Sequence, residues 1–167
     1  MRRLILLRHA KSDWPAGIAD HERPLGKRGR KDGPRIGEAM ATRGLVPAQA
    51  IVSTALRTRQ TWDLVKPALG DVPERFEAKI YEADPATILK VIRATPPSVP
   101  SLLVVGHNPG LELVAAHLAA SCEDRAVLTT KFPTGAFAVI DFNTKAWSDV
   151  AQGQGTLALF MIPAELD

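Results

Sequence analysis

Short runs of consecutive apolar residues alternate along this chain with longer amphipathic segments, and this alternation limits the possible folds more than any other feature. Residues 4–7 (Leu-Ile-Leu-Leu) and 102–105 (Leu-Leu-Val-Val) are typical of strands buried on both faces of a sheet. Strands alternating with helices favour a three-layer α/β/α fold around a mainly parallel central sheet. The other predicted strands lie at 50–52 and near 76–80, and the predicted helices lie at 27–43, 55–69, 85–94 and 109–120.

Two regions depart from this alternation. Residues 10–25 contain two prolines and a glycine and are predicted to form a long loop. Near the C-terminus, strands are predicted at 135–142 and 156–162 with no helix between them. Pro34 falls within the predicted helix 27–43 and is expected to start or kink it, because proline cannot donate a backbone hydrogen bond.

Length and composition are those of an ordinary globular domain. The chain has 167 residues, of which 46% are apolar, so we expect one domain spanning residues 1–167. No run approaches the roughly 18 apolar residues of a membrane span. The apolar stretch at 4–7 is also shorter than the roughly 7–15 residues of a secretion signal. We therefore expect a cytoplasmic protein with no membrane partner, in which the single Cys122 is a small buried hydrophobe.

The charge balance is mildly basic. The formal net charge is +3, and Lys27, Arg28, Arg30 and Lys31 form a short basic cluster that could suggest nucleic-acid binding. Only 5% of the residues are aromatic, however, and none are interleaved with basic residues to make a stacking platform for bases. We interpret the cluster as a solvated helix face and expect no nucleic-acid partner.

Polar side chains follow three of the predicted strands at the point where each strand ends. Arg8 and His9 follow the first strand, Arg57 follows the second after a short turn, and His107 follows the strand at 102–105. The carboxyl ends of parallel strands meet at one edge of a sheet, which is where ligands bind in such folds. Arginine presents a fork of N–H donors suited to phosphate oxygens, and a neutral histidine is a competent nucleophile.

Two predicted helix starts point to the same edge. Thr54 is a plausible N-cap that would place Arg57 at position N3, in the first turn of the helix. Asn108 is a second N-cap candidate, with Pro109 at the favoured position N1. Helix N-termini direct unpaired N–H groups and partial positive charge outward, so this edge is predicted to bind an anion.

The order and spacing of these segments resemble the histidine phosphatase superfamily, also called the phosphoglycerate-mutase-like family. The resemblance rests on Arg8-His9, on Ser53-x-x-Leu56-Arg57-x-x-Gln60-Thr61 and on Gly106-His107-Asn108-Pro109. The short length, the Arg23-Pro24-Leu25 element followed by Arg28-Gly29, and the small C-terminal part are similar to bacterial SixA-type phosphohistidine phosphatases. The resemblance covers residues 2–162 and implies a phosphoglycerate-mutase-like fold.

The resemblance also implies a covalent mechanism that needs neither a metal nor a cofactor. His9 would attack phosphorus, while Arg8, Arg57 and His107 would hold the phosphoryl oxygens, and water would then hydrolyse the phosphohistidine intermediate. Members that act on phosphate monoesters use a carboxylate as general acid, and Glu82 stands at the corresponding place after the strand near 76–80. Glu82 could instead be an exposed residue or a charge at a helix N-terminus, a role open equally to Asp84. That alternative stays open.

Three positions depart from the family pattern. Ala10 replaces a glycine after the nucleophile, Pro15 replaces an asparagine that binds phosphate in many members, and Gly26 replaces a threonine. Lys11 or Ser12 could take over the contact that Pro15 cannot make. The remaining candidates for substrate contacts are His21, in the long loop, and Thr134, before the late strand.

These observations predict a phosphatase that dephosphorylates phosphohistidine on a protein or peptide, such as a signalling or phosphotransfer protein. One alternative is a phosphatase for small phosphorylated metabolites. Another is a non-catalytic module that binds phosphate or a phosphoprotein, although such a module would have no use for a nucleophile at His9.

Overall fold

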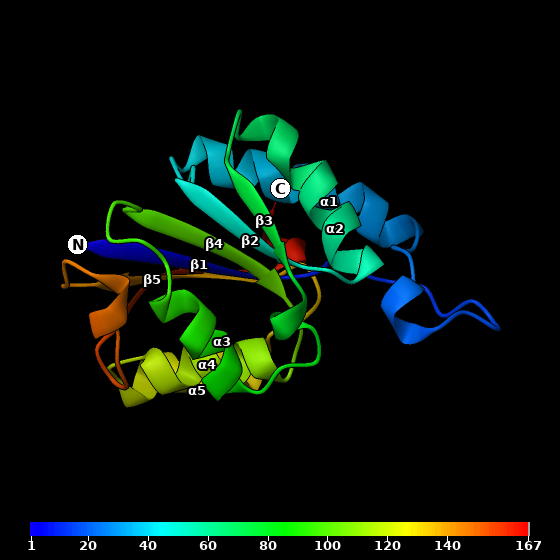
Figure 1. The fold of residues 1–167 in the computed structure, drawn as a ribbon. Coiled ribbons are helices and arrows are strands. Elements are labelled where there is room, and N and C mark those ends of the chain that lie inside the picture. Colours follow the sequence, from blue (N-terminus) through cyan, green and yellow to red (C-terminus); the bar gives the residue numbers. More distant parts are fainter. Residues whose placement is uncertain (167) are drawn as a thin grey trace.

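A single six-stranded sheet forms the centre of the molecule (Figure 1). The computed structural model describes residues 1–166. The strand order is β3-β2-β4-β1-β5-β6, and β3, β2, β4 and β1 run parallel, whereas β5 and β6 pair in antiparallel fashion. The predicted, mainly parallel sheet is therefore confirmed. The strands are β1 (Arg2–Arg8), β2 (Gln49–Ser53), β3 (Glu74–Glu77), β4 (Ser101–Gly106), β5 (Phe137–Phe142) and β6 (Thr156–Met161).

Helices cover both faces of this sheet, which confirms the three-layer α/β/α architecture. Two helices lie on one face and three on the other (Figure 1). The first pair is α1 (Lys27–Thr42) and α2 (Leu56–Val65), and the second set is α3 (Pro85–Arg93), α4 (Gly110–Leu118) and α5 (Cys122–Thr130). None of the helices within residues 1–166 combines the length and the apolar character needed to cross a membrane.

The apolar run in β1 is continuous because this strand contributes to two separate cores. Leu4 and Leu6 belong to the cluster under α3, α4 and α5, whereas Ile5 and Leu7 belong to the cluster under α1 and α2. Successive side chains of a strand point to opposite faces, so a central strand covered on both sides must be apolar at every position. The uninterrupted pattern seen in the sequence thus has a direct structural cause.

Several details of the structure differ from the sequence prediction. Pro34 lies inside α1 and does not start it, and its exposed side chain lies on the solvent side of the helix. Helix α5 was not predicted, because only Leu128 of its nine residues is buried and no apolar stripe marks it. Cys122 is exposed at the start of α5 rather than buried. Strand β3 begins two residues early, and residues 78–80 form a 3-10 turn.

Candidate active site

The carboxyl ends of β1, β2 and β4 bring the predicted histidines together. These three strands are neighbours in the sheet, and His9 extends β1 by one residue, with its backbone N–H donating to Gly106 O at 3.1 Å. The ring centroids of His9 and His107 lie 5.4 Å apart. Residues almost a hundred positions apart in sequence are therefore neighbours because the sheet is parallel at this point.

His9 is held as a neutral base with one nitrogen available. Its Nδ1 lies 2.8 Å from Ala10 O, so Nδ1–H donates to this carbonyl and the lone pair is left on Nε2. Burial lowers the pKa of His9 to about 3, and the charges of His107, Arg57 and Arg8 act in the same direction. The imidazole is consequently uncharged near pH 7, which is the state that a nucleophile requires.

His107 is fixed from the neighbouring strand. Its Nε2 lies 2.7 Å from Ser53 Oγ at the end of β2, and its Nδ1 is buried without a partner among the described residues. Burial, followed by the charge of Arg57, lowers the pKa of His107 to about 3. Ser53 was noted in the sequence only as part of a family motif, and the structure gives it a specific role as the hydroxyl that orients this ring.

The two arginines approach from different elements. Arg57 lies in the first turn of α2 and donates to Asp20 O at 2.8 Å and to Asp20 Oδ2 at 3.1 Å. Arg8 ends β1 and donates to Phe132 O at 3.1 Å. The Nε atoms of both arginines are buried and have no partner among residues 1–166. Buried donors of this kind are costly unless an acceptor reaches them, so the site is suited to an anion with several oxygens.

Both predicted helix caps are displaced by one residue. Ala55, not Thr54, is the N-cap of α2, so Arg57 lies at N2 rather than N3, and Thr54 Oγ1 lies 2.9 Å from His21 Nε2 instead. Pro109 is the N-cap of α4, although the Asn108 side chain still accepts from Glu112 N at 3.2 Å. Each helix still begins beside the proposed anion site, since Arg57 and His107 both line the same cleft.

Asp20 is the most connected residue that the sequence analysis missed. It accepts hydrogen bonds from Arg57, Arg23 and the Tyr81 hydroxyl. The Tyr81 hydrogen bond, with those of Arg23 and Arg57, holds the pKa of the Asp20 carboxyl well below its usual range. Burial and the Asp20 charge raise the pKa of Tyr81 to about 12. Asp20 therefore stays ionised and ties the long loop, α2 and the segment after β3 together around Arg57.

A cleft of about 490 Å³ opens in front of this network. Glu82 lines it, is exposed, and has a backbone φ of 53°, a left-handed conformation that is unusual for a residue with a side chain. Asp84 also lines the cleft, but its carboxylate accepts from Thr87 N at 2.8 Å and caps α3. The helix-terminal role considered for Glu82 therefore belongs to Asp84, whereas Glu82 remains a lining residue of the cleft.

The weaker candidates fall into two groups. Ser12 is buried and its Oγ accepts from Arg23 at 2.7 Å, and His21 is held between Thr54 and the edge of the Tyr81 ring. Lys11 and Thr134 lie beside a different, smaller hollow of about 280 Å³. The structure thus places Ser12 and His21 in the framework of the site and Lys11 and Thr134 at a separate hollow.

The departures from the family pattern are accommodated locally. Pro15 lies in the exposed stretch 13–19 and lines no part of the cleft. A Cβ at Gly26 would lie 2.5 Å from Asp13 Oδ1, so the Asp13 side chain occupies the space that a larger residue would need. Gly29 is required more strictly, because a Cβ there would lie 2.1 Å from Lys11 O, a backbone atom of the loop that follows the nucleophile.

Comparison with known proteins agrees with this geometry. The sequence profile of the histidine phosphatase superfamily (branch 1) matches residues 4–88. The chain belongs to this superfamily. Among its relatives, the uncharacterized protein Rv1276c of Mycobacterium tuberculosis is 39% identical to this histidine phosphatase over 163 residues, covering 94% of this chain and 99% of the relative.

Solved structures give a narrower placement within the superfamily. The candidate phosphohistidine phosphatase SixA from Agrobacterium tumefaciens superposes on this histidine phosphatase with a TM-score of 0.85 and 31% identity, covering 97% of this chain and 98% of that one. The protein histidine phosphatase SixA complexed with tungstate has a TM-score of 0.82 at 21% identity and covers 99% of both chains, which shows the shared fold. This chain is a SixA-type member and a phosphatase of the histidine phosphatase type.

Proposed function

We propose that this histidine phosphatase hydrolyses phosphohistidine in proteins or peptides through a phosphohistidine intermediate at His9. The observation that carries the proposal is the state of His9. It is buried and neutral, its Nδ1 proton is bound to Ala10 O, and its Nε2 is available beside His107. Similarity to the SixA proteins supports phosphohistidine as the substrate.

The proposed reaction has two displacements. His9 Nε2 forms a bond to phosphorus as the bond from phosphorus to the substrate imidazole breaks, and the departing imidazole takes the bonding electrons and a solvent proton. Water then forms a bond to phosphorus as the bond between phosphorus and His9 Nε2 breaks; the bonding electrons return to Nε2, the water loses a proton to solvent, and inorganic phosphate is released. Phosphoryl transfer depends mainly on positioning and charge stabilisation. Arg8 Nε, Arg57 Nε and His107 Nδ1, all buried and unpartnered among the described residues, would donate to the phosphoryl oxygens.

A comparison of substrates tests this proposal. Catalytic efficiency would be measured with a phosphohistidine peptide, an alkyl phosphate and p-nitrophenyl phosphate on one enzyme preparation. We expect the highest kcat/KM with the phosphohistidine peptide. A higher kcat/KM with the alkyl phosphate would instead favour the second candidate function, hydrolysis of small phosphorylated metabolites, which the position of Glu82 in the cleft favours. Binding of phosphate without turnover of any substrate would favour a non-catalytic module.

Glu82→Gln should separate the two leaving groups. An alkoxide leaves poorly unless an acid protonates it, and a positioned acid contributes roughly 10²–10⁴-fold. Imidazole, with an ordinary pKa of about 6.5, leaves readily near pH 7. We therefore expect the variant to hydrolyse phosphohistidine at nearly the original kcat and to lose roughly 10²-fold in kcat with an alkyl phosphate. Equal slowing of both substrates would show that Glu82 supports the structure rather than protonating a leaving group.

Activity is expected to survive metal removal. Arg8 and Arg57 supply the positive charge at the proposed phosphate site, and together with the neutral His107 they supply the donors. Within residues 1–166, no group of three or more His, Cys, Asp or Glu side chains is arranged to hold a metal ion. Turnover measured after dialysis against EDTA should equal that of untreated enzyme. Loss of turnover that added Mg²⁺ or Zn²⁺ restores would contradict a metal-independent mechanism.

A further inference from the structure

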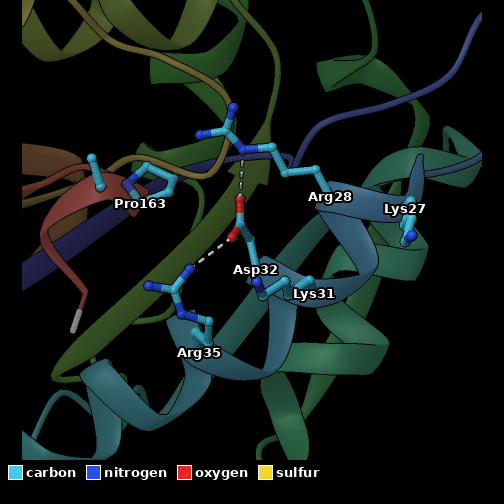
Figure 2. Close-up of a pocket in the computed structure, with 7 residues that line it drawn as sticks. Lys27, Arg28, Lys31, Asp32, Arg35 and Pro163 are labelled. Atoms are coloured by element: carbon cyan, nitrogen blue, oxygen red, sulfur yellow. Dashed lines mark hydrogen bonds and ion pairs between the residues drawn. The ribbon is translucent and has the colours of Figure 1, made fainter.

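A basic groove lies beside the proposed active site and, among the described residues, shares no lining residue with the cleft at Glu82. We define it by the side chains of Lys11, Lys27, Arg28, Lys31 and Lys131. It consists of two adjoining hollows of about 280 and 510 Å³, which share Arg28, Asp32, Pro163 and Ala164 in their walls. Figure 2 shows the larger hollow, with the Arg28 and Arg35 side chains of α1 extending toward the side on which Pro163 lies.

The groove is attached to the nucleophile through backbone contacts. Lys11 follows His9 by two residues, and Lys11 O accepts from Gly26 N at 2.9 Å. The close approach of Gly29 to the same carbonyl fixes the first turn of α1 against this loop. On the opposite wall, Gly135 N, next to Thr134, donates to His9 O at 2.9 Å. The smaller hollow therefore begins directly beside the backbone that positions His9.

The groove is strongly positive. Asp32 is the only acid among the described lining residues, it is only 5% exposed, and Arg28 and Arg35 pair with it at 3.7 and 3.0 Å. Figure 2 marks both ion pairs. The five side chains that define the groove carry +5, against a net charge of +3 for the whole chain. The cleft at Arg57 and His107 instead has the acids Glu82 and Asp84 among its lining residues.

We propose that the basic groove binds an acidic segment of the polypeptide that carries the phosphohistidine. The inference rests on the proposed function and adds to it the chemistry that selects and orients the protein substrate. A Glu- or Asp-rich segment fits the basic groove and is repelled by the acidic rim at Glu82 and Asp84, so the two surfaces together fix one direction of binding. Complementary charge also raises the rate of encounter.

The lining of the groove favours a polypeptide over a nucleic acid. Among the described residues, neither hollow is lined by an aromatic side chain. Single-stranded nucleic acids are held by stacking of bases on aromatic rings. Apart from Thr134, the uncharged residues of the lining are apolar: Pro133, Ile162, Pro163 and Ala164. Such a surface can pack against the stems of glutamate side chains while the lysines meet the carboxylates.

The test uses two synthetic phosphohistidine peptides, one with a run of glutamates beside the phosphohistidine and one with glutamines in their place. Lys27→Glu/Lys31→Glu reverses two of the five charges that define the groove, both at exposed positions of α1. Lys27 lies in the first turn, where an acid suits the helix N-terminus, so the helix should be retained. Lys90→Glu/Lys145→Glu makes the same charge change at exposed positions outside the groove and serves as the control. Binding of the unphosphorylated peptides is followed by chemical-shift changes in backbone amides.

We expect the unphosphorylated glutamate peptide to change the chemical shifts of the backbone amides of Lys27–Asp32. At low salt, the phosphohistidine peptide with glutamates should be hydrolysed with a kcat/KM about tenfold higher than the peptide with glutamines, because its KM is lower. The groove variant should lose this preference, whereas the control variant should keep it, and both should turn over p-nitrophenyl phosphate normally. The proposal would be overturned if the unaltered enzyme hydrolysed both peptides with the same kcat/KM, or if the groove variant kept the preference for the glutamate peptide.

Two further outcomes separate this inference from the substrate proposal. If the glutamate peptide binds in the groove but neither phosphohistidine peptide is hydrolysed, the proposed substrate is wrong and the groove assignment stands. If a single-stranded oligonucleotide of equal charge displaces the glutamate peptide and binds more tightly, the groove is a nucleic-acid site and the assignment to an acidic polypeptide is wrong.

Discussion

His9→Ala should reduce kcat by roughly 10³-fold or more, the scale of loss seen when an enzyme loses its nucleophile. The variant should also fail to acquire acid-labile label from a radioactive phosphoryl donor, because no lone pair remains to form the bond to phosphorus. The unaltered enzyme should keep its activity well below pH 6, since burial lowers the pKa of His9 to about 3 and the nucleophile is protonated only near that pH. Rapid-quench labelling and steady-state turnover measure these effects.

His117→Ala is the matched control. His117 is exposed on α4 and lies outside the cleft, so its loss should change neither labelling nor turnover. Acid-labile label that persists in His9→Ala at the original stoichiometry would show that another side chain is the nucleophile.

Arg57→Ala should lower kcat by roughly 10²–10³-fold, the usual cost of removing one donor from a site that stabilises developing negative charge. The interaction strengthens as charge builds on the transferring phosphoryl group, so the effect should fall on kcat more than on KM. Asp20 would keep hydrogen bonds from Arg23 and Tyr81, so the loop around it should remain in place. Arg57→Lys should recover only part of the rate, because lysine keeps the charge but loses the fork of donors.

Arg43→Ala is the control for Arg57→Ala, because it removes one positive charge at a position away from the site. Arg43 is exposed at the end of α1, and its removal should leave kcat unchanged. A raised KM with normal kcat in Arg57→Ala would mean that Arg57 holds substrate and transition state equally, and that its assigned part in catalysis is wrong.

The sheet and the positions of the two histidines could be predicted because both follow from strand periodicity and parallel pairing. Continuous apolar runs identified β1 and β4, and parallel neighbours must deliver the residues after them to one edge. Helix boundaries could not be predicted to the residue. Threonine is a preferred N-cap, so the sequence predicted Thr54 as the N-cap of α2, whereas the N-cap is Ala55, which makes no side-chain hydrogen bond. Helix α5 buries one side chain and therefore left no periodic signal.

The network around Asp20 could not be predicted from local pattern. Its hydrogen bond to Tyr81 joins residues 61 positions apart, and its contact with Arg57 joins residues 37 apart. Both depend on the path of an irregular loop, and loops have no period from which a side-chain direction can be read. The basic cluster in α1 is exposed, as the interpretation of a solvated helix face predicts. That it forms one wall of a groove could not be predicted, because the C-terminal segment opposite it is distant in sequence.

The position of β1 in the sheet has a consequence for how the chain folds. Leu4 pairs with Leu102 on one side and with Ile140 on the other, so the strand that precedes His9 is completed only by segments made much later. Contacts of such high sequence separation form slowly. At about 5–20 residues per second, a ribosome makes β5 several seconds to about half a minute after His9. A chain that stops before β5 would leave the apolar edge of β1 open as a template for aggregation.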